Sequence, residues 1–144
     1  MTGLLITGHG HFATGLFSSL KLITGITKHI VCVDFEENHS IDTLTENLHK
    51  AFYNLTDCNG VLVLSDLAGG SPFKAAVECK FARRDQAIEV TAGTNLPMLI
   101  TAASIMELYD NPLDMLGEVM STGKEYIVHY QLQKHEDHAE EDGI

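Results

Sequence analysis

Two side chains in this sequence have the chemistry of a histidine-based group-transfer site. His9 lies between Gly8 and Gly10 directly after an apolar run, and Asp66 follows a second apolar run. A neutral imidazole is a nucleophile through the ring nitrogen that carries no hydrogen. A carboxylate that accepts a hydrogen bond from Nδ1 fixes the tautomer, leaves the lone pair of Nε2 free and stabilises the ring when it becomes positive. Taken alone, each residue fits a structural role in its turn equally well.

A third feature is a candidate anion-binding turn shortly after Asp66. The residues Gly69, Gly70, Ser71 and Pro72 follow one another, and Ser71 with Pro72 is typical of a helix N-cap and first helical position. Exposed backbone N–H groups, a hydroxyl and the partial positive charge of a helix N-terminus together suit a phosphoryl group. The spacing is neither that of a Walker A loop nor that of a dinucleotide-binding fingerprint. The same residues also fit a tight turn and a helix cap.

A metal site is the alternative use of the first histidine. His9 and His11 have the spacing H-x-H, which can bind a metal, and Asp34 and His39 are conceivable further ligands. No matching group of Cys, Glu or His follows a second apolar run. The sequence therefore predicts neither a metal nor a cofactor.

The composition restricts the class of protein. The 144 residues suit one folded domain, with 44% hydrophobic residues and a net charge of −11. An acidic chain is a poor partner for nucleic acid or for an anionic membrane surface. No run approaches the roughly 18 apolar residues of a membrane helix, and no signal peptide is recognisable. Three cysteines without metal-ligand spacing are expected to be reduced, which favours a cytoplasmic location.

The order of the expected elements places these residues at one edge of a sheet. Apolar runs of strand length alternate with helix-length segments. Strands are expected at residues 4–7, 30–33, 61–64, 88–91 and 125–132, and helices at residues 12–24, 40–54, 71–82, 97–109 and 112–121. This alternation predicts an α/β fold with a parallel sheet between two layers of helices. Ligands of such folds bind at the carboxyl ends of the strands, where His9, Asp66 and Ser71 would lie.

Three motifs in this order resemble a known family. Gly8-His9-Gly10 follows the first strand, the sequence DLAGGSPF at residues 66–73 follows the third, and AGTNLPML at residues 92–99 follows the fourth. The chain resembles the mannose-family enzyme IIA component of the bacterial phosphoenolpyruvate-dependent sugar phosphotransferase system. The wider opening, residues 8–15, looks more like the N-acetylgalactosamine-type branch. The resemblance covers residues 1–132 as a single domain and leaves residues 133–144 as an acidic tail, which we expect to be disordered.

The resemblance implies roles for individual residues. His9 would be the phosphorylated nucleophile, and Asp66 would orient its ring. The groups that contact the phosphoryl group would come from Gly69, Gly70 and Ser71. A further wall of the site would include Thr94 and Asn95. An apolar rim for partner docking would draw on Leu67, Phe73, Leu96 and Met98.

The resemblance also implies partners. The phosphocarrier protein HPr would donate the phosphoryl group, and a histidine of a separate enzyme IIB would accept it during sugar uptake. The membrane would be reached only indirectly, through enzymes IIC and IID. Family members are homodimers that exchange their last strand, so residues 125–132 would form an antiparallel strand in the partner subunit's sheet. The transported sugar and the role of His11 do not follow from the sequence.

Other functions remain open at this point. The phosphotransfer subunit of a dihydroxyacetone kinase has the same motifs and would pass its phosphoryl group to a kinase-bound nucleotide. A regulatory binding module would bind an anion or a partner without transferring a phosphoryl group. A small metal-dependent hydrolase would use His9 and His11.

Overall fold

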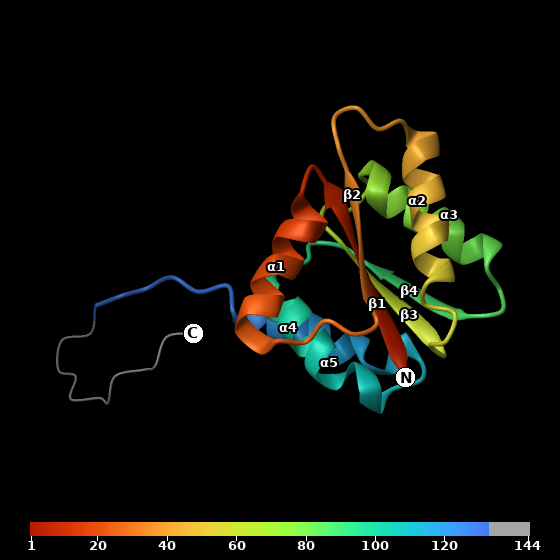
Figure 1. Cartoon of the computed structure of the whole chain (residues 1–144). Helices are drawn as coiled ribbons and strands as arrows, with labels where there is room; N and C mark the ends of the chain where they lie inside the picture. Colours follow the sequence, from red (N-terminus) through yellow and green to blue (C-terminus); the bar gives the residue numbers. More distant parts are fainter. Residues whose placement is uncertain (133–144) are drawn as a thin grey trace.

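A four-stranded parallel sheet forms the centre of the molecule (Figure 1). The computed structural model describes residues 1–132, so the expected tail at residues 133–144 lies outside the described part. The strand order is β2-β1-β3-β4. The strands are β1 (Thr2–His9), β2 (Ile30–Phe35), β3 (Gly60–Ser65) and β4 (Ala87–Thr91). Each neighbouring pair is parallel, so the carboxyl ends of all four strands lie at the same edge.

Helices cover both faces of this sheet, which confirms the predicted three-layer α/β fold (Figure 1). One face carries α1 (Phe12–Thr24), α4 (Leu96–Ile105) and α5 (Leu116–Glu125), and the other carries α2 (Ile41–Tyr53) and α3 (Ser71–Ala82). Two short 3-10 turns, η1 (Met106–Leu108) and η2 (Pro112–Asp114), connect α4 to α5. None of the helices in the described part of the chain is long and apolar enough to cross a membrane.

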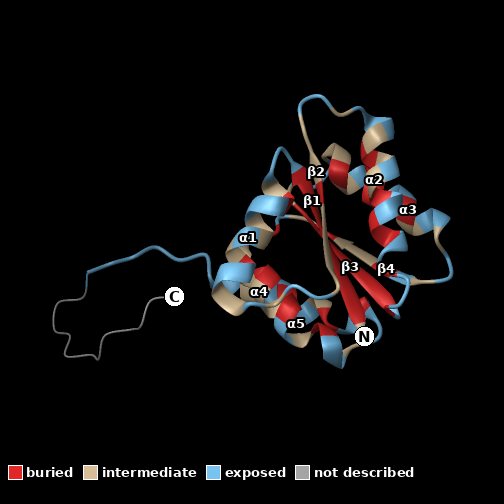
Figure 2. Ribbon diagram, viewed as in Figure 1, coloured by how far each residue is buried: buried red, intermediate tan, exposed pale blue. Residues whose placement is uncertain are grey.

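The two central strands are buried on both faces (Figure 2). Successive side chains of a strand point to opposite faces, so each strand must supply apolar residues to two cores. The side chains that face α1, α4 and α5 are Leu4, Ile6, Leu62 and Leu64, and those that face α2 and α3 are Leu5, Val61 and Val63. This double burial explains why both strands are continuous apolar runs in the sequence.

Local residue types explain two of the helix ends. The Ser40 hydroxyl accepts the Thr43 N–H at 3.1 Å to cap α2, and Gly25 ends α1 in the left-handed conformation. At the start of α3 the predicted cap is wrong. Gly70 occupies the N-cap position with extended backbone angles, and Ser71 is already the first helical residue.

The chain after α4 differs most from the expected elements. The expected helix at residues 97–109 is α4 followed by η1, and the one at residues 112–121 is η2 followed by α5, which continues through Glu125. Residues 126–132 form neither helix nor strand, and they lead away from the body of the molecule (Figure 1). The expected antiparallel strand is thus not formed within a single chain, because a strand needs a neighbour for its N–H and C=O groups.

Candidate functional site

His9 is the last residue of β1, and its position follows from the order of the strands. β1 and β3 are neighbours, with Thr7 opposite Ser65, so the residue after Ser65 lies beside the end of β1. That residue is Asp66, 57 positions from His9 in the sequence. The His9 side chain is 48% exposed, and its ring packs edge-on to Phe35 of β2 with the ring centroids 5.9 Å apart. The ring is therefore held on two sides and open on a third.

The Asp66 carboxylate holds both the ring and the backbone of His9. Its Oδ2 lies 2.8 Å from His9 Nδ1 and also accepts the His9 backbone N–H at 2.8 Å, while Oδ1 accepts the Leu67 N–H at 2.7 Å. Partial burial favours the neutral acid, but these hydrogen bonds outweigh it and hold the pKa of Asp66 below its usual value. An ionised carboxylate only accepts hydrogen bonds, so Nδ1 carries the hydrogen and the lone pair is on Nε2.

Two glycines allow the close approach of these groups. A Cβ atom on Gly70 would lie 2.9 Å from His9 Cε1, and one on Gly8 would lie 2.9 Å from Asp66 Cγ. Real Cβ atoms essentially never make contacts this short, so a side chain at Gly70 would displace the imidazole. A side chain at Gly8 would displace the Phe12 ring, whose Cδ1 would lie 2.5 Å from the Cβ, as well as the Asp66 carboxylate. Gly8 and Gly70, from the first and second motifs, thus leave the space that the His9–Asp66 pair needs. This role is separate from the backbone freedom of glycine.

The N-terminus of α3 supplies hydrogen-bond donors next to the ring. Gly69 has a φ of +79°, which favours glycine, and turns the chain into the helix. The Gly70 N–H already donates to the Leu67 carbonyl at 3.0 Å. The Ser71 N–H is in the first turn of the helix, where N–H groups have no acceptor within the helix. Together with the partial positive charge of the helix end, this N–H suits an anion.

The loop after β4 lies at the same edge of the sheet, but its two predicted site residues, Thr94 and Asn95, have different contacts. The Thr94 N–H donates to the Ser65 carbonyl at 3.2 Å, and the Gly93 N–H to the Asp66 carbonyl at 3.0 Å. The Thr94 hydroxyl is buried without a hydrogen-bond partner in the described part of the chain. The Asn95 side chain instead caps α4 and donates from Nδ2 to the Gly123 carbonyl at 2.9 Å. Asn95 therefore fastens α4 to α5.

His11 belongs to a second carboxylate cluster that sequence reasoning did not resolve. Its Nδ1 lies 3.2 Å from Asp34 Oδ2, and its Nε2 lies 3.4 Å from Glu36 Oε1. Asp34 is held by Thr14, whose hydroxyl donates to it at 2.6 Å. His9 and His11 thus contact different carboxylates. His39, the other conceivable ligand, accepts the Glu36 N–H instead. Asp34 lies near the carboxyl end of β2, at the same edge of the sheet as His11. That position is the feature of the sequence that could have indicated their contact.

The expected apolar rim is only partly exposed. Leu67 is 60% exposed next to Asp66, whereas Met98 is 5% exposed and belongs to the core under α1, α4 and α5. Phe73 and Leu96 are half-buried. Of the four candidates, Leu67 is therefore the one that a partner would meet most directly.

Comparison with known proteins identifies the family of the chain. The profile of the family described as "PTS system fructose IIA component" matches residues 3–122. The chain is 36% identical over 107 residues to the "PTS system fructose-specific EIIA component" of Bacillus subtilis strain 168, a match that covers 74% of this chain and 72% of the relative. It is 31% identical over 130 residues to the "PTS system mannose-specific EIIAB component" of Escherichia coli K12, covering 88% of this chain and 39% of that longer protein.

Solved structures show the same fold. The phosphotransferase system component EIIA from Streptococcus agalactiae superposes with a TM-score of 0.83 at 31% identity, covering 90% of this chain and 97% of that one. The mannose/sorbose-specific IIA subunit from Enterococcus faecalis gives a TM-score of 0.82 at 22% identity, covering 94% and 98% of the two chains. Because the profile match, the curated relatives and the solved structures agree, this chain belongs to the fructose- and mannose-type enzyme IIA family of the phosphotransferase system.

Proposed function

We propose that this chain is a phosphoryl carrier in which His9 accepts a phosphoryl group from phospho-HPr and passes it to a histidine of an enzyme IIB. The observation that carries the proposal is the 2.8 Å contact between His9 Nδ1 and Asp66, which leaves the lone pair on Nε2. The name of the Escherichia coli relative, which joins an A and a B component, supports an enzyme IIB as the acceptor. We place the carrier in the cytoplasm, in contact with the membrane only through enzymes IIC and IID.

The chemistry requires little beyond positioning. The Nε2 lone pair of His9 forms a bond to phosphorus as the bond between phosphorus and the donor's ring nitrogen breaks, and that electron pair returns to the donor ring. Such transfers pass through a loose, metaphosphate-like transition state, so orientation and electrostatic stabilisation dominate. The His9 ring becomes positive as the bond forms, and Asp66 stabilises it. We assign contact with the phosphoryl oxygens to Gly69, Gly70 and Ser71, with Thr94 lining the site.

The exposure of His9 suits a protein as the donor. Its side chain is 48% exposed, and Leu67, which is 60% exposed, lies beside Asp66. A phosphohistidine on a partner's surface reaches such a ring without entering a closed cavity. Exposed apolar residues next to a reactive group favour a transient protein interface.

The central experiment measures the intact mass after incubation with phosphoenolpyruvate, enzyme I and HPr. We expect one acid-labile phosphoryl group on the wild-type chain and none on His9→Ala. His11→Ala is the matched control, because His11 lies on the same edge but contacts Asp34, and it should accept the group. An unphosphorylated wild type with an intact fold would overturn the proposal in favour of a regulatory binding module. Transfer onward to a dihydroxyacetone kinase rather than to an enzyme IIB would reject the sugar-uptake role alone.

Asp66→Asn should slow phosphorylation of His9 by on the order of 10- to 100-fold, because the amide keeps the shape of the carboxylate but loses its charge. The rate is followed by quenched-flow mass analysis. Asp34→Asn, which disturbs the neighbouring carboxylate–histidine contact, is the control and should react at the wild-type rate. Equal rates for Asp66→Asn and the wild type would remove Asp66 from the mechanism.

We further propose that residues 126–132 pair with a second copy of the chain to form a homodimer. Tyr126, Val128, Tyr130 and Leu132 are 66% to 83% exposed and would share one face of an extended strand. Such a run of exposed apolar residues is unfavourable in water unless another surface covers it. Pairing with a partner's sheet would also satisfy its backbone N–H and C=O groups.

Val128→Asp tests this dimer. Sedimentation-velocity analysis should show a dimer for the wild type and a monomer for Val128→Asp, because a buried carboxylate opposes the interface. Leu22→Asp is the matched control, since Leu22 is 88% exposed on α1, and it should remain dimeric. A monomeric wild type at micromolar concentration would refute the dimer without affecting the role of His9.

A further inference from the structure

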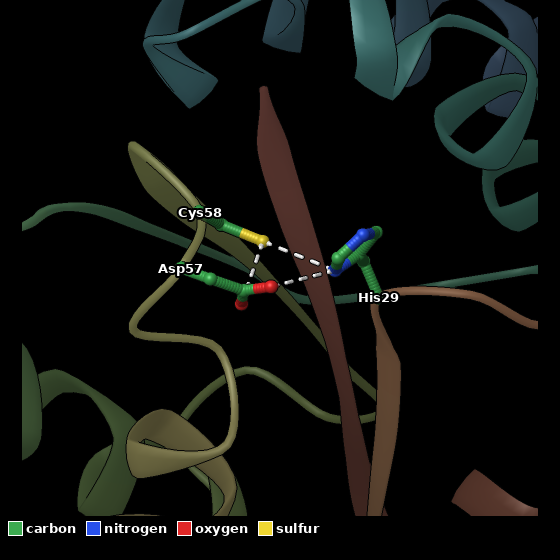
Figure 3. Close-up of side chains that lie close together, drawn as sticks. All are labelled: His29, Asp57 and Cys58. Carbon is green, nitrogen blue, oxygen red and sulfur yellow. Dashed lines mark hydrogen bonds and ion pairs between the residues drawn. The ribbon is translucent and has the colours of Figure 1, made fainter.

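Three side chains with different ligand atoms, His29, Asp57 and Cys58, lie close together (Figure 3). His29 directly precedes β2, and Asp57 and Cys58 lie in the loop that precedes β3. Because the strands are parallel, these loops lie at the amino ends, and His9 lies at the carboxyl ends. Of all His, Cys, Asp and Glu in the described residues, only these three gather closely enough to hold one metal ion together.

The distances between the three ligand atoms fit a shared ion. His29 Nδ1 lies 3.6 Å from Asp57 Oδ2 and 3.7 Å from Cys58 Sγ, and Cys58 Sγ lies 3.8 Å from Asp57 Oδ1. A nitrogen-to-oxygen separation of 3.6 Å is too long for a normal hydrogen bond. In a tetrahedral zinc site, neighbouring ligand atoms lie about 3.3–3.6 Å apart, as follows from zinc–ligand bonds of about 2.0–2.3 Å. Counting one ligand atom from each residue, the three atoms lie within 4.8 Å of one another, so a rotation of the exposed Asp57 carboxylate would bring them close to the spacing of a zinc site.

The backbone holds these side chains in place. His29 is the one non-glycine residue of the described chain with a positive φ, at 60°, and its carbonyl accepts the Leu4 N–H at 2.9 Å. The Cys58 carbonyl accepts the Gln86 side-chain amide at 3.0 Å. Gly3 leaves room for the sulfur, since a Cβ there would lie 3.0 Å from Cys58 Sγ. Ligands held by the surrounding structure lose little freedom when an ion binds.

One side of the cluster is open to water and the other is buried. Cys58 is 4% exposed. The Asp57 side chain is 66% exposed and that of His29 is 24% exposed, so the cluster is open to water on one side. A zinc ion would enter from that side and keep a water molecule as its fourth ligand.

We propose that His29, Asp57 and Cys58 bind one zinc ion. The set of one nitrogen, one oxygen and one sulfur suits zinc, whereas Mg²⁺ and Ca²⁺ prefer oxygen ligands alone. On binding, the Cys58 thiol releases its proton to solvent, and the thiolate, the neutral imidazole and the carboxylate bind the ion. The ion would fasten the loop before β2 to the loop before β3. This site is independent of phosphoryl transfer at His9.

Cobalt(II) titration of the full-length protein tests the proposal, because cobalt replaces zinc and reports its ligands in the absorption spectrum. We expect saturation at one equivalent, a thiolate-to-cobalt charge-transfer band, visible bands of tetrahedral geometry, and displacement by zinc. Cys58→Ser should abolish the charge-transfer band. Cys79→Ser is the matched control, because Cys79 is also buried beside a histidine, with Sγ 3.9 Å from His49 Nε2, and it should keep the band.

Several outcomes would overturn the site. These are no charge-transfer band in the wild type, a band that persists in Cys58→Ser, or one that disappears in Cys79→Ser. Cobalt bound by the histidines at positions 135 and 138 would give no sulfur band and would count against the proposal. Should Cys58→Ser fail to fold, the exposed Asp57→Asn decides the question. It should weaken cobalt binding at least tenfold, and unchanged affinity would reject the ligand set.

Discussion

The contact between His9 and Asp66 depends on the pairing of β1 with β3, and the rest of the candidate site depends on that contact. The two residues are 57 positions apart, and only the parallel register places their strand ends together. Asp66 then binds both the ring and the backbone of His9, so one carboxylate fixes the tautomer and the position of the imidazole. Gly8 and Gly70 are required for the same reason, since a Cβ at either would occupy the space of this pair.

The charges around the His9 ring also suit the phosphoryl group that we propose it carries. The negative charge of Asp66 faces Nδ1, on the side of the ring away from the lone pair of Nε2. The N-terminus of α3 contributes partial positive charge, and the Ser71 N–H in its first turn has no acceptor within the helix. Negative charge on one side of the ring and partial positive charge beside it suit the phosphoryl group that we propose His9 carries.

Sequence patterns predicted most of the fold because the elements have local causes. Burial of β1 and β3 on both faces required continuous apolar runs. Ser40 and Gly25 are residue types typical of a helix N-cap and of a helix C-terminus, and they occupy these positions in α2 and α1. The wrong prediction, Ser71 as the cap of α3, concerns a turn with a contact far away in the sequence, since Gly70 occupies the N-cap position and lies against His9. The expected strand at residues 125–132 stays a prediction, because its neighbour would belong to a second chain. The cluster of His29, Asp57 and Cys58 has no sequence spacing that reveals it, since sheet topology alone joins its two loops.

The most direct test of the account is the position of phosphorus on the His9 ring. Phosphorus–nitrogen correlated NMR of the phosphorylated, nitrogen-15-labelled protein identifies the substituted ring nitrogen. We predict a bond to Nε2, because Asp66 holds the hydrogen on Nδ1. A phosphoryl group on Nδ1, or on any residue other than His9, would contradict it.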